Sequence, residues 1–205
     1  MNDYVVLFSG TKVAAKWGAP TVVDMAQALS RIPRFSGNAW EWFPVALHCF
    51  VVADLLPVPL KVYGLTHDGA ECVGNDVPKP IKTQETSEME DAIQDRFWLS
   101  VGLPSLNEES RRILKAADNI ALLGEIHTIG PKGLAVDYPD RSQRAEQMVL
   151  YYLRKYPAGL CVQRGGPVMQ EFLRRFQFYM LGRARLEAQA IAARFRKQSP
   201  FKIIG

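Results

Sequence analysis

The chain has 205 residues, of which 48% are apolar, so it can bury one sizeable hydrophobic core. Its 25 Lys and Arg outnumber its 21 Asp and Glu, and the net charge of +4 favours phosphate-bearing partners but is too small to indicate a DNA-binding protein. The cysteines, Cys49, Cys72 and Cys161, lie far apart without a CxxC spacing, which argues against a disulfide framework and a zinc finger.

The sequence also predicts where the protein resides and how it is divided. The N-terminus lacks a basic segment followed by an apolar run and a cleavage site, and no stretch of about 18 apolar residues occurs. We therefore expect a cytoplasmic protein without a membrane partner. We expect a single domain over residues 1–205, in which residues 141–205 form a C-terminal helical extension packed on the rest.

Helical spacing of apolar residues dominates the chain, so we predict an all-α fold with minor β content near the N-terminus. Short strand signals occur at Tyr4–Phe8, as a small strand or edge hairpin, and at Lys132–Val136 within an otherwise irregular segment. The predicted helices are, in chain order, Asp24–Ser30 with Thr21 as its cap, Val45–Leu55, Leu60–Cys72, one capped by Thr86 or Ser87, one starting at Asn107, Ser142–Tyr156, and Val168–Lys197.

Ionisable residues interrupt three of these apolar helices. His48 lies in the helix 45–55, His67 and Asp68 lie in the helix 60–72, and Asp118 lies in the helix that starts at Asn107. Because a buried charge without a partner is costly, such groups are normally paired or bound to a metal. Two imidazoles and two carboxylates supply enough ligands for one divalent ion, with room left for water or a substrate oxygen. Such an ion would lower the pKa of water and polarise a phosphoryl oxygen.

Residues His48, His67-Asp68 and Asp118 resemble the H…HD…D signature of the HD-domain metal-dependent phosphohydrolases. The run His67–Pro80 is similar to the HDxxE…GD-x-P-x-P motif of the bacterial and phage 5′-deoxynucleotidase branch, and the similarity extends to Ala26–Gly37 and Lys115–Asp118. It covers roughly residues 4–125. The resemblance implies an HD-type helical bundle that hydrolyses a deoxynucleoside phosphate.

By position, the resemblance also implies a role for each matched residue. One divalent ion (Mn, Co, Zn, Fe, Ni or Mg) would be held by His48, His67, Asp68 and Asp118. Glu71 would act as general acid or base, and Asp76 would orient water or the sugar. The expected substrate contacts are Arg34, Phe35, Trp40 and Trp42, with Lys79 and Lys82 within reach of a polyphosphate.

The chain departs from the family pattern at two places. Leu47-His48-Cys49 stands where relatives have Glu-His-Ser, so the supporting glutamate beside the first ligand is missing. Gly37-Asn38 stands where many relatives have Gly-His. A different substrate preference is therefore expected.

Three functions stay open. The first is a 5′-deoxynucleotidase that releases phosphate from deoxynucleoside monophosphates, and the second is a dATP or dNTP triphosphohydrolase. The third is a non-catalytic HD protein that regulates or binds nucleic acid through its basic last helix, although a charged helix face is more often simply solvated. The apolar stripe of that helix (Met169, Phe172, Leu173, Phe176 and Met180) fits an intramolecular contact or a homo-oligomer.

Individual residues also have ordinary structural interpretations. A lone histidine in an apolar helix is most often a core residue with a satisfied hydrogen bond, an aspartate before Val-Pro can be a turn former, and paired tryptophans can simply pack. These interpretations apply to His48, Asp76, Trp40 and Trp42, and solvation is the ordinary state of Lys79 and Lys82.

Overall fold

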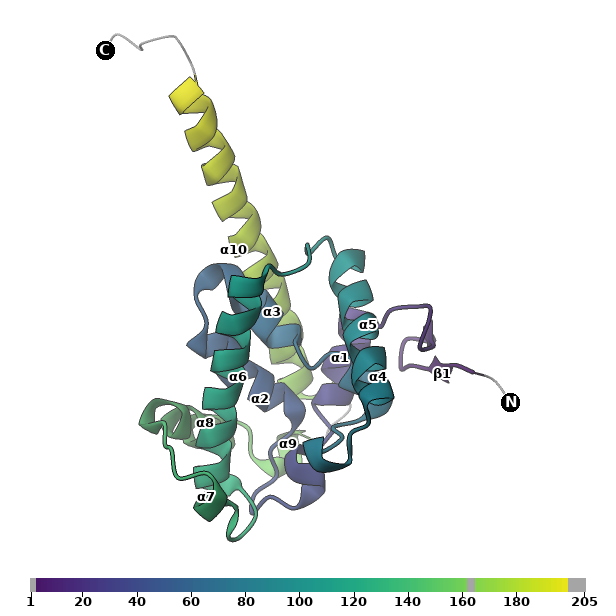
Figure 1. Ribbon diagram of the computed structural model, residues 1–205, viewed down its shortest axis with the longest axis vertical. Coiled ribbons are helices and arrows are strands. Elements are labelled where there is room, and N and C mark those ends of the chain that lie inside the picture. The colour runs from purple at the N-terminus through teal and green to yellow at the C-terminus, as the bar shows by residue number, and fades with distance from the viewer. Residues whose placement is uncertain (1–2, 162–164, 199–205) are drawn as a thin grey trace.

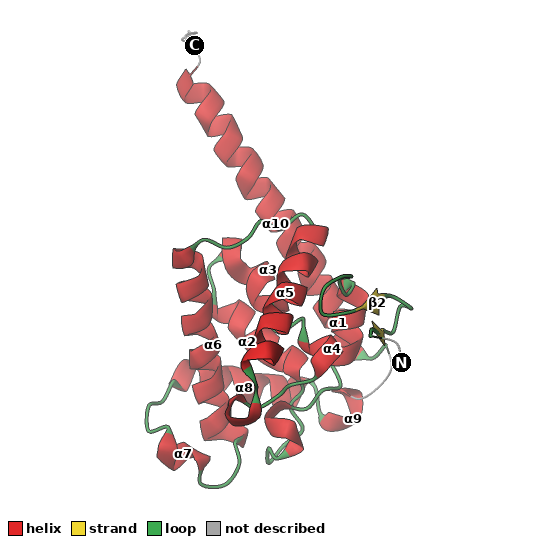
Figure 2. Cartoon of the chain, turned by 45° about the vertical axis from the view of Figure 1, so that its right-hand side comes forward, coloured by secondary structure: helices red, strands yellow, loops and turns green. Residues whose placement is uncertain are grey.

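A computed structural model of the protein describes residues 3–161 and 165–198. Helices make up most of these residues, and the only sheet in the two ranges is a two-stranded hairpin near the N-terminus (Figures 1 and 2). The predicted all-α class with minor N-terminal β content is confirmed.

The hairpin pairs strand β1 (Val5–Val6) with strand β2 (Lys12–Val13) in antiparallel register, with Val5 opposite Val13. Gly10 forms the turn with a φ of +87°, a value that glycine adopts without steric cost. The predicted edge hairpin at Tyr4–Phe8 is confirmed, although its first strand is only two residues long.

Helix α1 (Val22–Leu29) begins at Thr21, which caps it as predicted. The Thr21 hydroxyl accepts a hydrogen bond from the Asp24 backbone, and the Asp24 carboxylate accepts one from the Thr21 backbone in return. Helix α2 (Val45–Leu55) follows Pro44 and is buried on all sides from Val45 to Ala53, as expected of a helix in the middle of a bundle.

The predicted helix Leu60–Cys72 is wrong in its second half. A 3-10 turn (Val58–Leu60) leads into helix α3 (Lys61–Thr66), and after a turn the short helix α4 (Glu71–Gly74) follows. In the turn the backbone N–H groups of Gly69 and Glu71 bond three residues back, to Thr66 and Asp68, so the chain winds more tightly than an α-helix. His67 and Asp68 therefore lie in a turn.

Helix α5 (Gln84–Ser100) starts earlier than predicted, because Thr83 is its cap instead of Thr86 or Ser87: the Thr83 hydroxyl accepts from the Thr86 backbone. A 3-10 turn at Lys79–Ile81 precedes it. Helix α6 (Glu108–Ile129) begins directly after Asn107, close to the predicted start, and the Asn107 side chain caps it.

The predicted strand at Lys132–Val136 is wrong. Gly133 has a φ of +90°, and the residues after it form the short helix α7 (Leu134–Asp137). Within the described ranges no strand pairs with this segment, and without a partner a β-prone run has no ladder to join. Helix α8 (Gln143–Lys155) and the short helix α9 (Ala158–Cys161) come next.

The last helix, α10 (Pro167–Gln198), has nearly the predicted bounds. Its first half packs on α1, α2 and α3 through buried Val168 and Phe172, and its second half extends beyond the bundle (Figure 1). The side chains of Arg194, Arg196 and Lys197 lie outside the described residues. In the described ranges, no helix combines the length and apolarity needed to cross a bilayer.

Helix α2 organises the main hydrophobic core. Helices α3, α6, α8 and α10 all contact it, and α6 also packs along α8. A smaller cluster of Val13, Ala70 and Ile93 lies under the hairpin. Because α2 lies at the centre, any side chain that it directs towards α3 and α6 is withdrawn from water, and His48 is such a side chain, with no exposed surface.

Candidate metal centre

Side chains from three parts of the chain meet beside α2. His48 comes from α2, His67 and Asp68 from the turn after α3, and Asp118 from α6. The Nε2 atoms of His48 and His67 are 3.3 Å apart. Asp118 Oδ1 lies 3.2 Å from His48 Nε2 and 3.7 Å from His67 Nε2. Asp68 Oδ1 lies 3.1 Å from His67 Nε2. The structure thus brings together all four residues that the sequence singles out.

A glycine allows α3 to lie close to α2 and so brings the two histidines together. A Cβ atom on Gly64 would lie 2.4 Å from Leu56 Cδ1 and 3.2 Å from the backbone of Ala53. A side chain at this position would require Leu56 to move and would crowd the Ala53 backbone. The carbonyl oxygen of Gly64 also accepts a hydrogen bond from the His67 ring.

Both histidines use the other ring nitrogen as a hydrogen-bond donor. His48 Nδ1 lies 2.6 Å from Glu125 Oε1, and His67 Nδ1 lies 2.9 Å from the carbonyl oxygen of Gly64. Because these oxygens only accept, each Nδ1 carries a proton, and Nε2 is the ring nitrogen that faces the centre and is available to an ion. Metal-binding histidines show this same arrangement, in which an outer carboxylate or carbonyl fixes the ring.

The charges of the cluster also favour a cation. The histidine rings hold the pKa of Asp118 far below its usual value, although burial opposes this. Burial lowers the pKa of His67, but Asp68 and Asp118 outweigh burial and raise it well above the usual value. The carboxylates therefore stabilise positive charge between the rings, whether as protons on the imidazoles or as a metal ion.

Nitrogen and oxygen donors in this arrangement suit one divalent ion, and His48, His67 and Asp118 form a group that can hold a metal. Asp68 lies beside this group, with its Oδ2 3.6 Å from His48 Nε2. A second possible group uses Cys49 with His67 and Asp68. Burial raises the pKa of the Cys49 thiol to about 11, which leaves it protonated and a poorer ligand than the carboxylate of Asp118.

A buried ionic network lies behind the centre. Glu125, which has no exposed surface, accepts hydrogen bonds from His48 and from Arg34 Nε at 3.0 Å. Arg34 also donates to Asp76 Oδ2 at 3.2 Å. Arg34, expected to contact substrate, thus pairs with two carboxylates and links Asp76 to His48 through Glu125.

Glu125 was not identified from the sequence. Because no Glu precedes His48, the sequence predicted that no carboxylate would hydrogen-bond to the His48 ring. The missed signal is its spacing. Glu125 lies two helical turns after Asp118 and therefore on the same side of α6, amid the apolar run before Ile129.

Glu71 and Asp76 both lie beside the four residues. Glu71 is buried, and its Oε2 has no hydrogen-bond partner in the described part of the chain. Burial, together with Asp68 and Asp76, raises the pKa of Glu71 well above its usual value. Burial also raises the pKa of Asp76, while Arg34 opposes that shift. A carboxyl group held in the protonated state can donate a proton, which is the property of a general acid.

A cavity of about 400 Å³ opens on the centre between α5 and α6. His67, Asp68, Glu71 and Asp118 line part of it, so a ligand in the cavity can reach the candidate metal centre. Its other walls carry residues that the sequence did not single out: Glu90, Asp91, Gln94, Asp95, Trp98, Leu106, Arg111, Leu114 and Lys115.

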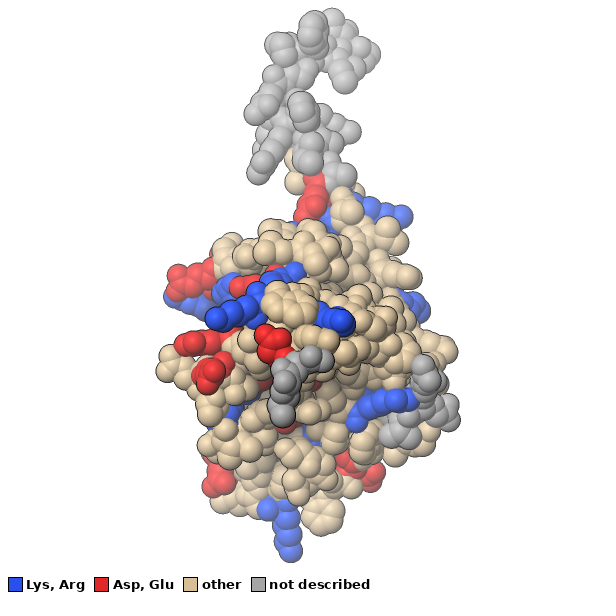
Figure 3. Space-filling model, turned by 90° about the vertical axis from the view of Figure 1, so that its right-hand side faces the viewer, with Lys and Arg blue, Asp and Glu red and all other residues tan. Residues whose placement is uncertain are grey.

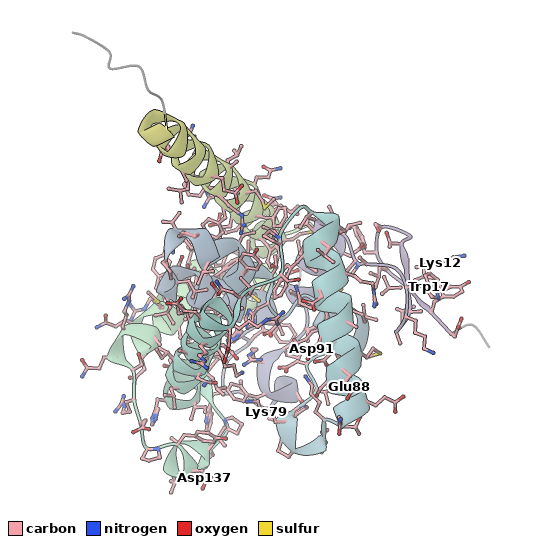
Figure 4. The ribbon with its side chains drawn as sticks, turned by 45° about the horizontal axis from the view of Figure 1, so that its top comes forward. Lys12, Trp17, Lys79, Glu88, Asp91 and Asp137 are labelled. Carbon is pink, nitrogen blue, oxygen red and sulfur yellow. The ribbon has the colours of Figure 1, made fainter. Side chains whose placement is uncertain are left out.

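Of the expected substrate contacts, Lys82 is the one that lines this cavity, where it pairs with Glu90 at 2.5 Å. Trp40 is 70% exposed, and Lys79 lies on the surface before α5 (Figure 4). Trp42 and Phe35 pack against the hydrophobic core, and Phe35 adopts a left-handed φ of 55° in the 3-10 turn Arg34–Gly37. The aromatic residues of this loop do not line the cavity.

Charged side chains of both signs are interspersed on the face in Figure 3. The described arginines of α10 are largely neutralised within the helix. Arg174 and Arg175 both bond to Glu171, and Arg183 bonds to Glu187.

No protein-family profile matches the chain. Over 109 residues the chain is 31% identical to the uncharacterized protein YfdR of Escherichia coli (strain K12), and this alignment covers 52% of the chain and 60% of YfdR. The chain thus matches about three fifths of the length of this relative, whose name states no activity.

Proposed function

We propose that the protein is a divalent-metal-dependent phosphohydrolase of the HD-domain type, acting on deoxynucleotides and most readily on a 5′-monophosphate. The observation that supports this is the meeting of two histidine Nε2 atoms 3.3 Å apart with the carboxylates of Asp68 and Asp118, at the end of a cavity of about 400 Å³. The choice of deoxynucleotides rests on the resemblance of the His67–Pro80 run.

In this proposal each residue has a distinct task. His48, His67, Asp68 and Asp118 hold the ion. The ion, when bound, supplies Lewis-acid polarisation of a phosphoryl oxygen and acidifies water. Glu71, whose carboxyl group is buried and proton-retaining, exchanges a proton with the leaving group or the attacking water. Arg34 holds Asp76 in place beside it.

A triphosphohydrolase is the second candidate. Lys82, Arg111 and Lys115 all line the cavity, and cations are the side chains that contact the oxygens of a polyphosphate. The products separate the two: dAMP would yield inorganic phosphate, whereas dATP would yield tripolyphosphate and deoxyadenosine. A binding module on nucleic acid is less favoured, because Glu171 and Glu187 pair with Arg174, Arg175 and Arg183 of α10.

The test is hydrolysis of dAMP and dATP by the full chain after addition of Mn²⁺ or Co²⁺, with metal content measured in parallel. Asp68→Ala should lose both metal and turnover, because it removes a ligand. Glu71→Ala should keep the metal and lose turnover, and Glu88→Ala, an exposed acid on α5, should change neither. Retention of full activity by Asp68→Ala, or no hydrolysis by the metal-loaded protein, would reject the proposal that the protein is a metal-dependent phosphohydrolase.

A further inference from the structure

The cavity combines the polar side chains of the candidate metal centre with an apolar wall. Trp98, Leu106 and Leu114 form this wall, from α5, the loop after it and α6. A volume of about 400 Å³ lies within the range of small-molecule sites, which combine apolar walls with a few fixed polar groups. The cavity therefore has room for more than a phosphate group.

Trp98 is held in a single orientation. Its indole Nε1 donates to the Thr66 hydroxyl at 3.0 Å, and its ring meets the ring of Tyr63 edge-on at 5.2 Å. Only 5% of its surface is exposed. A rigid aromatic side chain in a cavity wall provides apolar contact for a flat ligand at little entropic cost.

Gln94 supplies a buried hydrogen-bond donor in this region, whereas the other unpartnered buried atoms of the cavity residues, Glu71 Oε2 and Glu90 Oε1, are carboxylate oxygens. Gln94 Oε1 accepts a hydrogen bond from the Ala70 backbone at 3.2 Å, which fixes the orientation of the amide. Its Nε2 is buried and makes no hydrogen bond to any described residue. An unpaired buried donor is destabilising, so an acceptor on a ligand in the cavity would relieve that cost.

The charges along the cavity disfavour extra phosphates. Each cation already has an acidic partner: Lys82 pairs with Glu90, Arg111 with Asp95, and Lys115 with Asp118. Asp91 lines the same cavity, is exposed, and has no ion pair within the described ranges; in Figure 4 it lies on the side of α5 towards α6. The second and third phosphates of a triphosphate would meet these acids.

The geometry points to a nucleoside subsite in this cavity, with the ring system against Trp98 and Leu114 and an acceptor atom bound to Gln94 Nε2. The phosphate lies at the metal end, and the acidic wall selects a single phosphate over a chain of three. This inference rests on the proposed function and names both the subsite and the substrate class. It places the nucleoside against α5 and α6, away from Trp40 and Trp42.

Gln94→Glu tests the subsite, because the carboxylate still accepts from Ala70 but donates nothing to a ligand. Binding of dAMP and of inorganic phosphate to the metal-loaded protein would be measured by calorimetry. We expect dAMP to bind about tenfold more weakly and inorganic phosphate to bind as in the wild type. Gln84→Glu makes the same change at an exposed position of α5 and should leave both affinities unchanged.

Asp91→Lys tests the selection of one phosphate. Reversing this charge should raise kcat/KM for dATP relative to dAMP by about tenfold, since an acid in the path of the extra phosphates is replaced by a cation. Glu88→Lys, one turn earlier on α5 and outside the cavity, carries the same charge change and should leave the ratio unchanged (Figure 4).

The outcomes separate this inference from the proposed function. If the protein releases phosphate but Gln94→Glu and Asp91→Lys behave like their controls, the subsite is wrong and the function stands. If no nucleotide is hydrolysed but dAMP binding depends on Gln94, the subsite stands and the hydrolase is wrong. If wild-type protein prefers dATP and releases tripolyphosphate, or binds neither dAMP nor dATP, the subsite assignment fails.

Discussion

His48 Nδ1 and Glu125 Oε1 lie 2.6 Å apart, and neither side chain has any surface exposed to solvent. A carboxylate in this position fixes the tautomer of the imidazole, so that Nε2 faces His67 and Asp118 with its lone pair. It also makes Nε2 a more basic ligand. Arg34 compensates the buried charge of Glu125 from the other side, at 3.0 Å.

Removal of Glu125 should therefore weaken metal binding without removing any of the four presumed ligands. We expect Glu125→Ala to lower the affinity for Mn²⁺ or Co²⁺ by about 10- to 100-fold, as for other outer carboxylates. Glu125→Gln keeps an acceptor for His48 Nδ1 and should recover part of this loss. Competition with a chromogenic chelator measures both values.

The matched control is Glu109→Ala, an exposed acid at the start of the same helix. It should bind metal like the wild type. Equal metal affinity in Glu125→Ala and Glu109→Ala would show that Glu125 only balances the charge of Arg34. Circular dichroism of each variant would confirm that the helices remain folded.

The four presumed ligands could be singled out from the sequence because the signal does not depend on exact helix boundaries. An ionisable residue in an apolar run is conspicuous wherever the helix begins or ends. His67 and Asp68 were grouped correctly with His48 even though they lie in a turn instead of the predicted helix. The bounds of α2 and α10 were predictable for a similar reason, since Pro44 and Pro167 mark both starts.

The cavity walls could not be predicted from the sequence. Gln94 and Trp98 belong to a helix whose capping residue was misplaced, and only the fold brings them to the same cavity as Asp118. The prediction of a strand at Lys132–Val136 was wrong for a related reason: a β-prone run forms a strand only where another strand is available to pair with it. Trp40 and Trp42 drew attention through composition, which says nothing of the direction of a side chain.

Gly64 should be essential for the approach of α3 to α2. The Cβ of Gly64→Ala would meet Leu56 and the Ala53 backbone, and such overpacking typically costs about 1–3 kcal/mol. Displacement of α3 would also move His67, so metal affinity should fall together with the melting temperature. Thermal melts and metal titrations of the variant measure both effects.

Gly182→Ala makes the same substitution in α10, where nothing lies within 4 Å of the added atom. It should stabilise the protein by about 0.5–1 kcal/mol, because alanine favours a helix more than glycine does. Opposite signs for the two variants are expected. Destabilisation of equal size in both would mean that the contacts of Gly64 are not the cause.

Asp24 should make the stability depend on pH at the acidic end. Burial raises the pKa of Asp24, but hydrogen bonds from Thr21 and Ser9 outweigh burial and lower it below the usual 3.8. A group whose pKa is lower in the folded state contributes stability above its unfolded value, and this contribution disappears as the pH falls through the folded value. The contribution should thus be complete at neutral pH and be lost below about pH 4.

Asp24→Asn should consequently unfold at lower urea concentration than the wild type at pH 7, with a loss of about 1 kcal/mol as for other helix caps. The difference should shrink as the pH is lowered from 4 towards 2, because the wild-type carboxylate then takes up a proton and loses the same advantage. Asp137→Asn, at an exposed position far from α1 (Figure 4), should follow the wild type throughout. A gap between Asp24→Asn and wild type that stays constant from pH 7 to pH 2 would contradict the role of the ionised carboxylate.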